Sequence, residues 1–208
     1  MQELNCPSCG AKVPFTSKVS LVAVCPHCRS QVLRDELDLK DLGKVADLHE
    51  DGSVVQLGAR GSYKGTAFSV VGRLQLRFPD GYWNEWHLGL ADGRQGWLGE
   101  AAGTYAVSFP AQEASLPTFD ALRVGSTVKL GGVAYEVSDL RHAEYLSAEG
   151  ELPFQAPLGE EAPLADLRGE GARFATLDYS EDAPLAFLGE YVPFPQLKLD
   201  GLKAVEGW

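Results

Sequence analysis

The chain has 208 residues and a formal net charge of −11, and 45% of its side chains are apolar and 10% aromatic. This composition excludes an unfolded chain, because it supplies enough apolar surface for a folded core. No stretch approaches the ~18 apolar residues of a membrane span, and the opening MQELNCPSCG lacks a charged region followed by an apolar one, so we expect a cytoplasmic protein without an export signal.

All four cysteines fall in two CxxC pairs near the start of the chain. Cys6 and Cys9 form the first pair, fifteen residues follow, and Cys25 and Cys28 form the second. Each CxxC folds as a tight turn whose two thiolates point the same way, and two such turns joined by a β-hairpin supply the four-sulfur shell that Zn²⁺ accepts. We therefore predict one structural zinc ion in a ribbon over residues 1–34, with no open coordination position for chemistry.

Other uses of these cysteines fit the sequence less well. A redox CxxC normally occurs once, in a βαβ context that is absent here, and two disulfides contradict a reducing compartment. His27 lies between two cysteines and could replace one as a ligand, but the middle residues of a CxxC usually point away from the metal.

Residues 35–53 are predicted to form a polar linker with one short helix. Asp38 suits the helix N-cap, and Asp51-Gly52 suits its end. Apolar side chains recur between them at helical spacing. They share one face: Leu39, Leu42, Val45, Ala46 and His49.

From Val54 the apolar pattern changes to a period of two, which is typical of strands with one buried face. Five strands joined by short turns are predicted over residues 54–112, with turns at Pro79-Asp80-Gly81 and Asp92-Gly93. Such a run forms an antiparallel meander that is curled or closed into a small barrel.

The second half of the chain repeats this plan. A shift of 67 residues aligns Gly58 with Gly125, Gly65 with Gly132 and Val70 with Val137. We expect a second β repeat over residues 113–208, with an inserted acidic loop at 149–170. The predicted fold class is mainly β, with a zinc ribbon followed by a duplicated antiparallel β-meander or small barrel.

The chain resembles a bacterial family, domain-of-unknown-function family 4178, in which a CPxCG/CPxC ribbon precedes one or two β-rich repeats. The resemblance rests on the ribbon and on DLGKVADLHEDGS, LGARGSYKGTAFSVVGR, DGYWNEWHLGLADGRQGWLGE, ADLRGEGARFATLDYS and FLGE. One departure is Arg29, where many ribbons carry a second Gly. The family has no assigned activity. Its genes tend to lie beside genes for membrane-stress proteins and polyamine-synthesis enzymes, which implies a cellular context.

The sequence favours a non-catalytic binding or scaffold protein that acts with a protein partner. It contains no evident nucleophile beside a base and no phosphate-binding glycine loop. Two alternatives stay open: a nucleic-acid-binding protein that uses the basic ribbon, and an enzyme with an unrecognised site. The acidic charge of the chain argues against the first alternative, and association with a membrane is expected only through a partner.

The outward face of the first long hairpin is the expected partner surface. A three-residue turn at Pro79-Asp80-Gly81 pairs Phe78 with Tyr82. Three further pairs then face solvent: Arg77 with Trp83, Gln75 with Glu85, and Arg73 with His87. This stripe has the composition of an interaction hot spot, and the Arg73 charge is expected to hold His87 neutral near pH 7. Its occupant is expected to be a protein partner or the second repeat.

Overall fold

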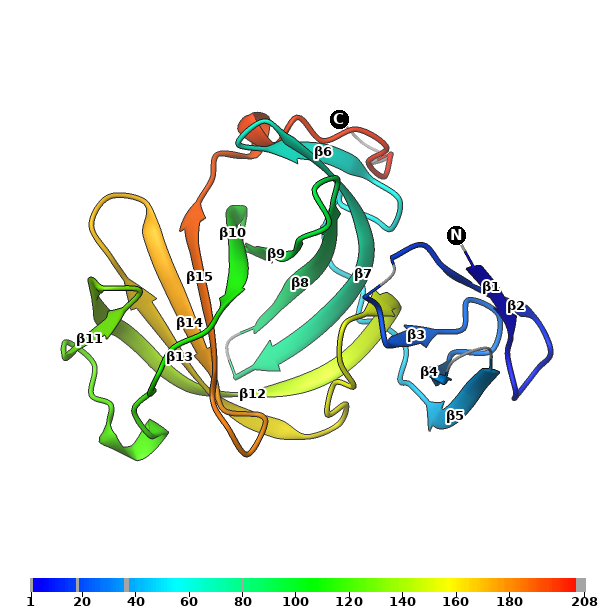
Figure 1. The fold of residues 1–208 in the computed structure, drawn as a ribbon, viewed down its shortest axis with the longest axis horizontal. Helices are drawn as coiled ribbons and strands as arrows, with labels where there is room; N and C mark the ends of the chain where they lie inside the picture. Colours follow the sequence, from blue (N-terminus) through cyan, green and yellow to red (C-terminus); the bar gives the residue numbers. More distant parts are fainter. Residues whose placement is uncertain (1, 18, 36–37, 80, 205–208) are drawn as a thin grey trace.

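The structure is a computed structural model that describes residues 2–17, 19–35, 38–79 and 81–204. In this part of the chain the secondary structure is almost entirely β, which confirms the predicted class. The strands build two units that lie side by side, a small N-terminal ribbon and a larger closed barrel (Figure 1).

The ribbon consists of five short strands. They are β1 (Gln2–Asn5), β2 (Lys12–Phe15), β3 (Val22–Val24), β4 (Ser30–Asp35) and β5 (Asp38–Lys44). Strands β1 and β2 form a hairpin, and β3, β4 and β5 pair in chain order in a second sheet. Val13, Phe15 and Val32 fill the small core between them, together with the buried Cys6 and Cys25.

The helix predicted within residues 35–53 is wrong. Strand β5 occupies part of this segment and pairs antiparallel with β4. Leu39 packs into the ribbon core, so the pairing with a neighbouring strand overrides the helical spacing of the apolar residues. The ribbon sheet therefore continues past residue 34, the boundary expected from the sequence.

The second unit is built from ten strands. They are β6 (Arg60–Tyr63), β7 (Thr66–Phe78), β8 (Gly81–Leu90), β9 (Gln95–Ala101), β10 (Thr104–Ala111), β11 (Thr127–Leu130), β12 (Val133–Leu152), β13 (Glu161–Arg168), β14 (Arg173–Asp178) and β15 (Leu185–Tyr191). Eight of them pair in the order β7-β8-β9-β10-β15-β14-β13-β12, and β12 pairs with β7. The sheet is thus a closed antiparallel barrel, with β6 and β11 attached as hairpins to β7 and β12.

Each half of the chain supplies four of the eight barrel strands, and the two halves share local backbone features. The amides of Gly58 and Gly125 donate to the carbonyl oxygens of Val70 and Val137, each at 2.8 Å. Register shifts follow directly after both valines, in β7 and in β12. These features agree with the 67-residue shift in the sequence, and the superposition of the complete halves stays a prediction.

The long acidic loop expected at residues 149–170 does not form. Strand β12 continues to Leu152 and β13 begins at Glu161, so the connection spans only residues 153–160. The end of β12 pairs with β7 through Glu149 and with β3 through Glu151. Because these partners lie far away in sequence, the local composition gave no sign of the strand.

A bulge in β7 lets this strand face two cores. Phe68 and Val70 pack outside the barrel, beneath β6 and the short helix η2 (Phe194–Leu197). After the bulge, Leu74 and Leu76 point into the barrel. A third cluster, around Val137, lies outside the other half of the barrel beside β11 and the segment that includes helix η1 (Phe119–Ala121).

The register predicted for the β7–β8 hairpin is wrong by one residue. Phe78 pairs with Gly81 and not with Tyr82, so the connection is Pro79 and Asp80, of which Asp80 lies outside the described residues. Side chains alternate along a strand, and a shift of one residue therefore moves the side chains of β8 that pair with residues 72–78 to the opposite face relative to the prediction. Beyond the bulge in β7, Leu88 and Leu90 pair with Val70 and Phe68 and share their face, as predicted.

Candidate metal centre and barrel cavity

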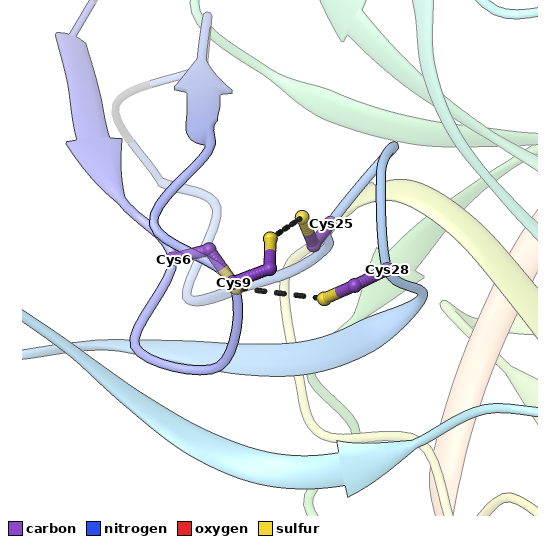
Figure 2. Close-up of side chains that lie close together, drawn as sticks. All are labelled: Cys6, Cys9, Cys25 and Cys28. Atoms are coloured by element: carbon purple, nitrogen blue, oxygen red, sulfur yellow. Dashed lines mark hydrogen bonds between the residues drawn. The ribbon is translucent and has the colours of Figure 1, made fainter.

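The two CxxC turns bring the four cysteine sulfurs together (Figure 2). The Sγ atoms of Cys6 and Cys28 lie 3.7 Å apart, and those of Cys9 and Cys25 lie 3.8 Å apart. All four sulfurs lie within 4.8 Å of one another. This cluster could hold a metal ion, as expected from the spacing of the cysteines, and the exposed His27 does not belong to it.

The spacing of the sulfurs fits a tetrahedral shell. Zn–S bonds of about 2.3 Å place the sulfurs of such a shell about 3.8 Å apart. Hydrogen bonding to Ser30 lowers the pKa of the Cys28 thiol to about 5. The amide of Ala11 favours the Cys9 thiolate, but burial and the other sulfurs outweigh it and raise the pKa of Cys9 to about 12. The thiols of Cys28 and Cys9 therefore differ in how readily they lose a proton. A metal ion would bind both as thiolates and displace their protons.

The two turns have the same backbone shape. The amides of Gly10 and Arg29 donate to the carbonyl oxygens of Cys6 and Cys25, at 2.8 and 2.9 Å. Both residues have positive φ, 77° for Gly10 and 58° for Arg29. Only glycine adopts this conformation without strain. The side chain of Arg29 donates hydrogen bonds to the carbonyl oxygen of Ala46 and to Ser147 Oγ on barrel strand β12.

The residues of the predicted partner stripe lie on two different faces of the sheet. Arg73 and Gln75 are buried on the outer side of the barrel, with 3% and 0% of their surfaces exposed. Trp83 and Glu85 line the inside of the barrel. His87 is fully buried, and its Nδ1 lies 2.8 Å from the carbonyl oxygen of Glu151. The predicted exposed stripe is therefore wrong.

The proposed cause of the neutral state of His87 is also wrong. Burial lowers the pKa of this imidazole, and Arg73 pairs across the strands with Trp86, on the other face. The remaining member of the stripe, Arg77, is exposed and forms an ion pair with Glu144.

A network of polar side chains surrounds Arg73 outside the barrel. Its guanidinium lies 4.6 Å from the ring centroid of Trp86 and donates to Asn84 Oδ1 at 2.7 and 2.9 Å. Asp51 pairs with this guanidinium and accepts a hydrogen bond from Gln75. Each polar group has a partner, so the network ties residues 49–53 to the barrel wall.

The interior of the barrel contains a cavity of about 200 Å³ that is partly open to solvent, and residues from all eight barrel strands line it. Large aromatic side chains form much of its wall. They include Trp83, Trp97, Tyr145, Phe154, Phe174 and Phe187. Phe154 belongs to the short connection between β12 and β13, and its ring lies 5.9 Å from that of Trp97.

Four acidic residues and one arginine also line the cavity. They are Glu85, Glu100, Asp166, Asp178 and Arg141. Glu85 accepts a hydrogen bond from Trp83 Nε1 at 3.1 Å, and Asp178 accepts one from the Tyr145 hydroxyl at 2.6 Å. Arg141 pairs with Asp166 at 3.2 Å and with Asp139.

The surroundings of the cavity shift the pKa values of several of its side chains. Burial, with repulsion from Asp166 and Asp178, raises the pKa of Glu85 to about 8. Burial also raises the pKa of Asp166, although the charge of Arg141 opposes this shift. Burial and the charge of Asp178 raise the pKa of Tyr145. Strongly perturbed groups in a cavity are typical of functional sites.

Sequence reasoning did not identify this cavity. Period-two spacing places Asp166 and Asp178 on their strands, but it does not tell which face becomes the interior of a closed barrel. Glu85 was selected for the opposite face. A signal was present in YWNEWHLG and ARFATLDYS, each of which combines two or more aromatic side chains with one acid.

The fold and the cysteine cluster define a ribbon-bearing β-barrel protein. The chain belongs to the family described as Domain of unknown function (DUF4178), whose sequence pattern matches residues 56–194. The matched region contains every barrel strand, and the ribbon precedes it. No curated protein and no solved structure matches the chain. Among the described residues, no helix is long and apolar enough to span a membrane.

Proposed function

We propose that this protein is a non-catalytic binding protein that holds a small ligand inside its barrel. The observation that carries this proposal is the cavity of about 200 Å³, lined by all eight strands and walled by aromatic side chains. Small-molecule sites are concave and mostly apolar, with a few placed polar groups. An eight-stranded barrel is wide enough to hold one small ligand.

The metal in this proposal is one structural zinc ion held by Cys6, Cys9, Cys25 and Cys28. Four thiolates complete a tetrahedral zinc shell and leave no position for water or substrate. The ion would supply folding free energy to the ribbon. The ribbon in turn supports the barrel, because β3 pairs with the end of β12.

The adaptor role expected from the sequence, with a protein partner in a cytoplasmic assembly linked to membrane stress or polyamines, stays a prediction. The surface that was expected to bind the partner is not exposed, since Arg73, Gln75 and His87 are buried. Ligand binding in the barrel needs no such surface and is therefore the better supported function.

Filling the cavity tests the proposal. Ala106 lines the cavity from β10, whereas Ala134 is exposed on β12. We expect the wild type to bind 1-hexanol or hexylammonium in titration calorimetry. We expect Ala106→Phe to weaken this binding at least about 10-fold, which corresponds to about 1.4 kcal/mol. Ala134→Phe should leave it unchanged. Binding that survives in a folded Ala106→Phe variant would place the ligand elsewhere and contradict the proposal.

A further inference from the structure

We infer that the barrel cavity takes an organic ammonium ion, a cationic nitrogen attached to an apolar body. This inference rests on the proposed function, ligand binding in the barrel, and adds the chemical class of the ligand. It follows from the charges, the hydrogen bonds and the aromatic walls of the cavity.

The cavity is lined by fewer basic than acidic side chains. The guanidinium of Arg141, which lines it, is already shared between Asp166 and Asp139. In the described ranges, no lysine, arginine or histidine forms an ion pair with Glu85 or Asp178. Buried carboxylates are normally paired with a cation or a metal. Among the described residues, these two acids therefore have no cationic partner in the cavity.

Within the described part of the chain, the hydrogen bonds to these two acids come from neutral donors. Trp83 Nε1 donates to one oxygen of Glu85. The two oxygens of Asp178 accept from the Tyr145 hydroxyl at 2.6 Å and from the Ser180 amide at 2.8 Å. The other oxygen of Glu85 thus remains for a donor on the ligand. An ammonium group supplies both the donor and the positive charge.

The walls suit a cation with an apolar body. The faces of aromatic rings attract cations, and desolvation strengthens this attraction. Trp83, Trp97 and Phe187 line the cavity together with Leu74 and Leu76, and these side chains provide apolar contact for a hydrocarbon chain or ring. An anionic ligand would meet the acidic side chains of the cavity and an arginine that is already paired.

Proton release gives an independent signature of this binding. Burial, with repulsion from Asp166 and Asp178, raises the pKa of Glu85 to about 8, so this acid holds a proton in the empty cavity at pH 7. The other titratable side chains that line the cavity are Arg141, Tyr145, Tyr191 and Glu100. A bound ammonium ion favours the ionised carboxylate, and the displaced proton leaves to the buffer.

The test compares three probes that share one six-carbon chain: hexylammonium, 1-hexanol and hexanoate. Each is titrated into the full-length, metal-loaded protein. We expect hexylammonium to bind at least 10-fold more tightly than 1-hexanol, and hexanoate to bind most weakly. Calorimetry of hexylammonium in buffers with different ionisation enthalpies should detect net proton release at pH 7.

Isosteric variants test whether Glu85 and Asp178 recognise the ammonium group. Glu85→Gln and Asp178→Asn should each reduce the preference for hexylammonium over 1-hexanol at least 5-fold, and Glu85→Gln should abolish the proton release. The exposed Glu181 provides the control, and Glu181→Gln should change neither quantity. Binding of 1-hexanol that is retained in the two variants would show that the cavity is intact.

The outcomes separate the two proposals. Equal binding of hexylammonium and 1-hexanol, both blocked by Ala106→Phe, would overturn the ammonium inference and leave the binding function standing. Tightest binding by hexanoate would overturn the inference in favour of Arg141 as the recognition group. Failure of all three probes to bind would overturn both proposals.

Discussion

At the residue scale, two glutamates on neighbouring strands show why one acid is structural and the other is a candidate binding group. Glu100 also lines the cavity, but its carboxylate accepts hydrogen bonds from Trp86 at 2.8 Å, Ser53 at 2.6 Å and Tyr105 at 3.1 Å. Glu85 faces the cavity and accepts one, from Trp83. A satisfied acid holds its surroundings in place, whereas an unsatisfied one remains available to a ligand.

The pH dependence of stability should report Glu85. Its folded-state pKa of about 8 lies above the ordinary value of 4.5, so the folded protein holds a proton that the unfolded chain releases. Stability therefore falls as the pH rises from about 4.5 to about 8 and then levels off. Glu85→Gln should flatten this slope in urea denaturation at pH 5, 6.5 and 8. An unchanged slope in the variant would mean that Glu85 is already ionised at neutral pH.

At the element scale, alternation along single strands was predictable and pairing between strands was not. Phe68, Val70, Leu74 and Leu76 were correctly assigned to buried positions because their spacing depends only on the local backbone. Their division between two cores depends on the bulge at residue 71, which has no clear sequence signal. The register of β8 depends on a turn that glycine and proline permit in more than one form.

The site shows the same division between local and long-range information. The cysteine cluster was predictable, because CxxC spacing fixes each pair of sulfurs locally. The cavity was not, because it needs β7 to close on β12 and β10 to pair with β15. Strand β5 was missed for a different reason: its partner β4 directly precedes it, but its apolar residues also fit helical spacing.

Barrel closure should depend on Gly72. This residue pairs with Gly150 across β7 and β12, and a Cβ atom at Gly72 would lie 1.9 Å from the backbone oxygen of Glu151. Gly72→Ala should therefore cost about 3 kcal/mol of folding free energy through overpacking. Gly89 serves as a matched control, because its nearest contact would be Val71 Cγ1 at 3.6 Å. Chemical denaturation of both variants checks this, and equal stability would refute the tight approach.

At the scale of the whole molecule, the ribbon and the barrel share a junction at the end of β12. The Glu151 carboxylate accepts hydrogen bonds from the amides of Thr16 and Ser17, at 2.7 and 3.0 Å. Arg29 reaches from the second cysteine turn to Ser147. The ribbon is thus joined to the barrel by a β-pairing, a buried acid and an arginine side chain.

Removal of the metal should unfold the ribbon and leave the barrel folded. We expect about one zinc ion per purified chain, and we expect Cys25→Ser or strong chelation to unfold the ribbon because metal binding supplies much of its folding free energy. The barrel should stay folded, since two of its core clusters lie on other strands, but it should lose stability because Val22 and Val24 of β3 belong to the remaining cluster. Metal analysis, thiol reactivity and circular dichroism check these outcomes. Iron, or no metal after anaerobic purification, would contradict the zinc assignment.

The central claim is that the ligand binds inside the barrel, and the indole N–H signals of the tryptophans test it most directly. Trp83 and Trp97 line the cavity, whereas Trp86 is fully buried in the core outside the barrel. Trp208, the fourth tryptophan of the chain, lies outside the described residues. In ¹H–¹⁵N spectra of the full-length protein, assigned with Trp→Phe variants, hexylammonium should shift the signals of Trp83 and Trp97 and leave that of Trp86 in place. A shift confined to Trp86, or saturable binding that leaves Trp83 and Trp97 unmoved, would contradict the account.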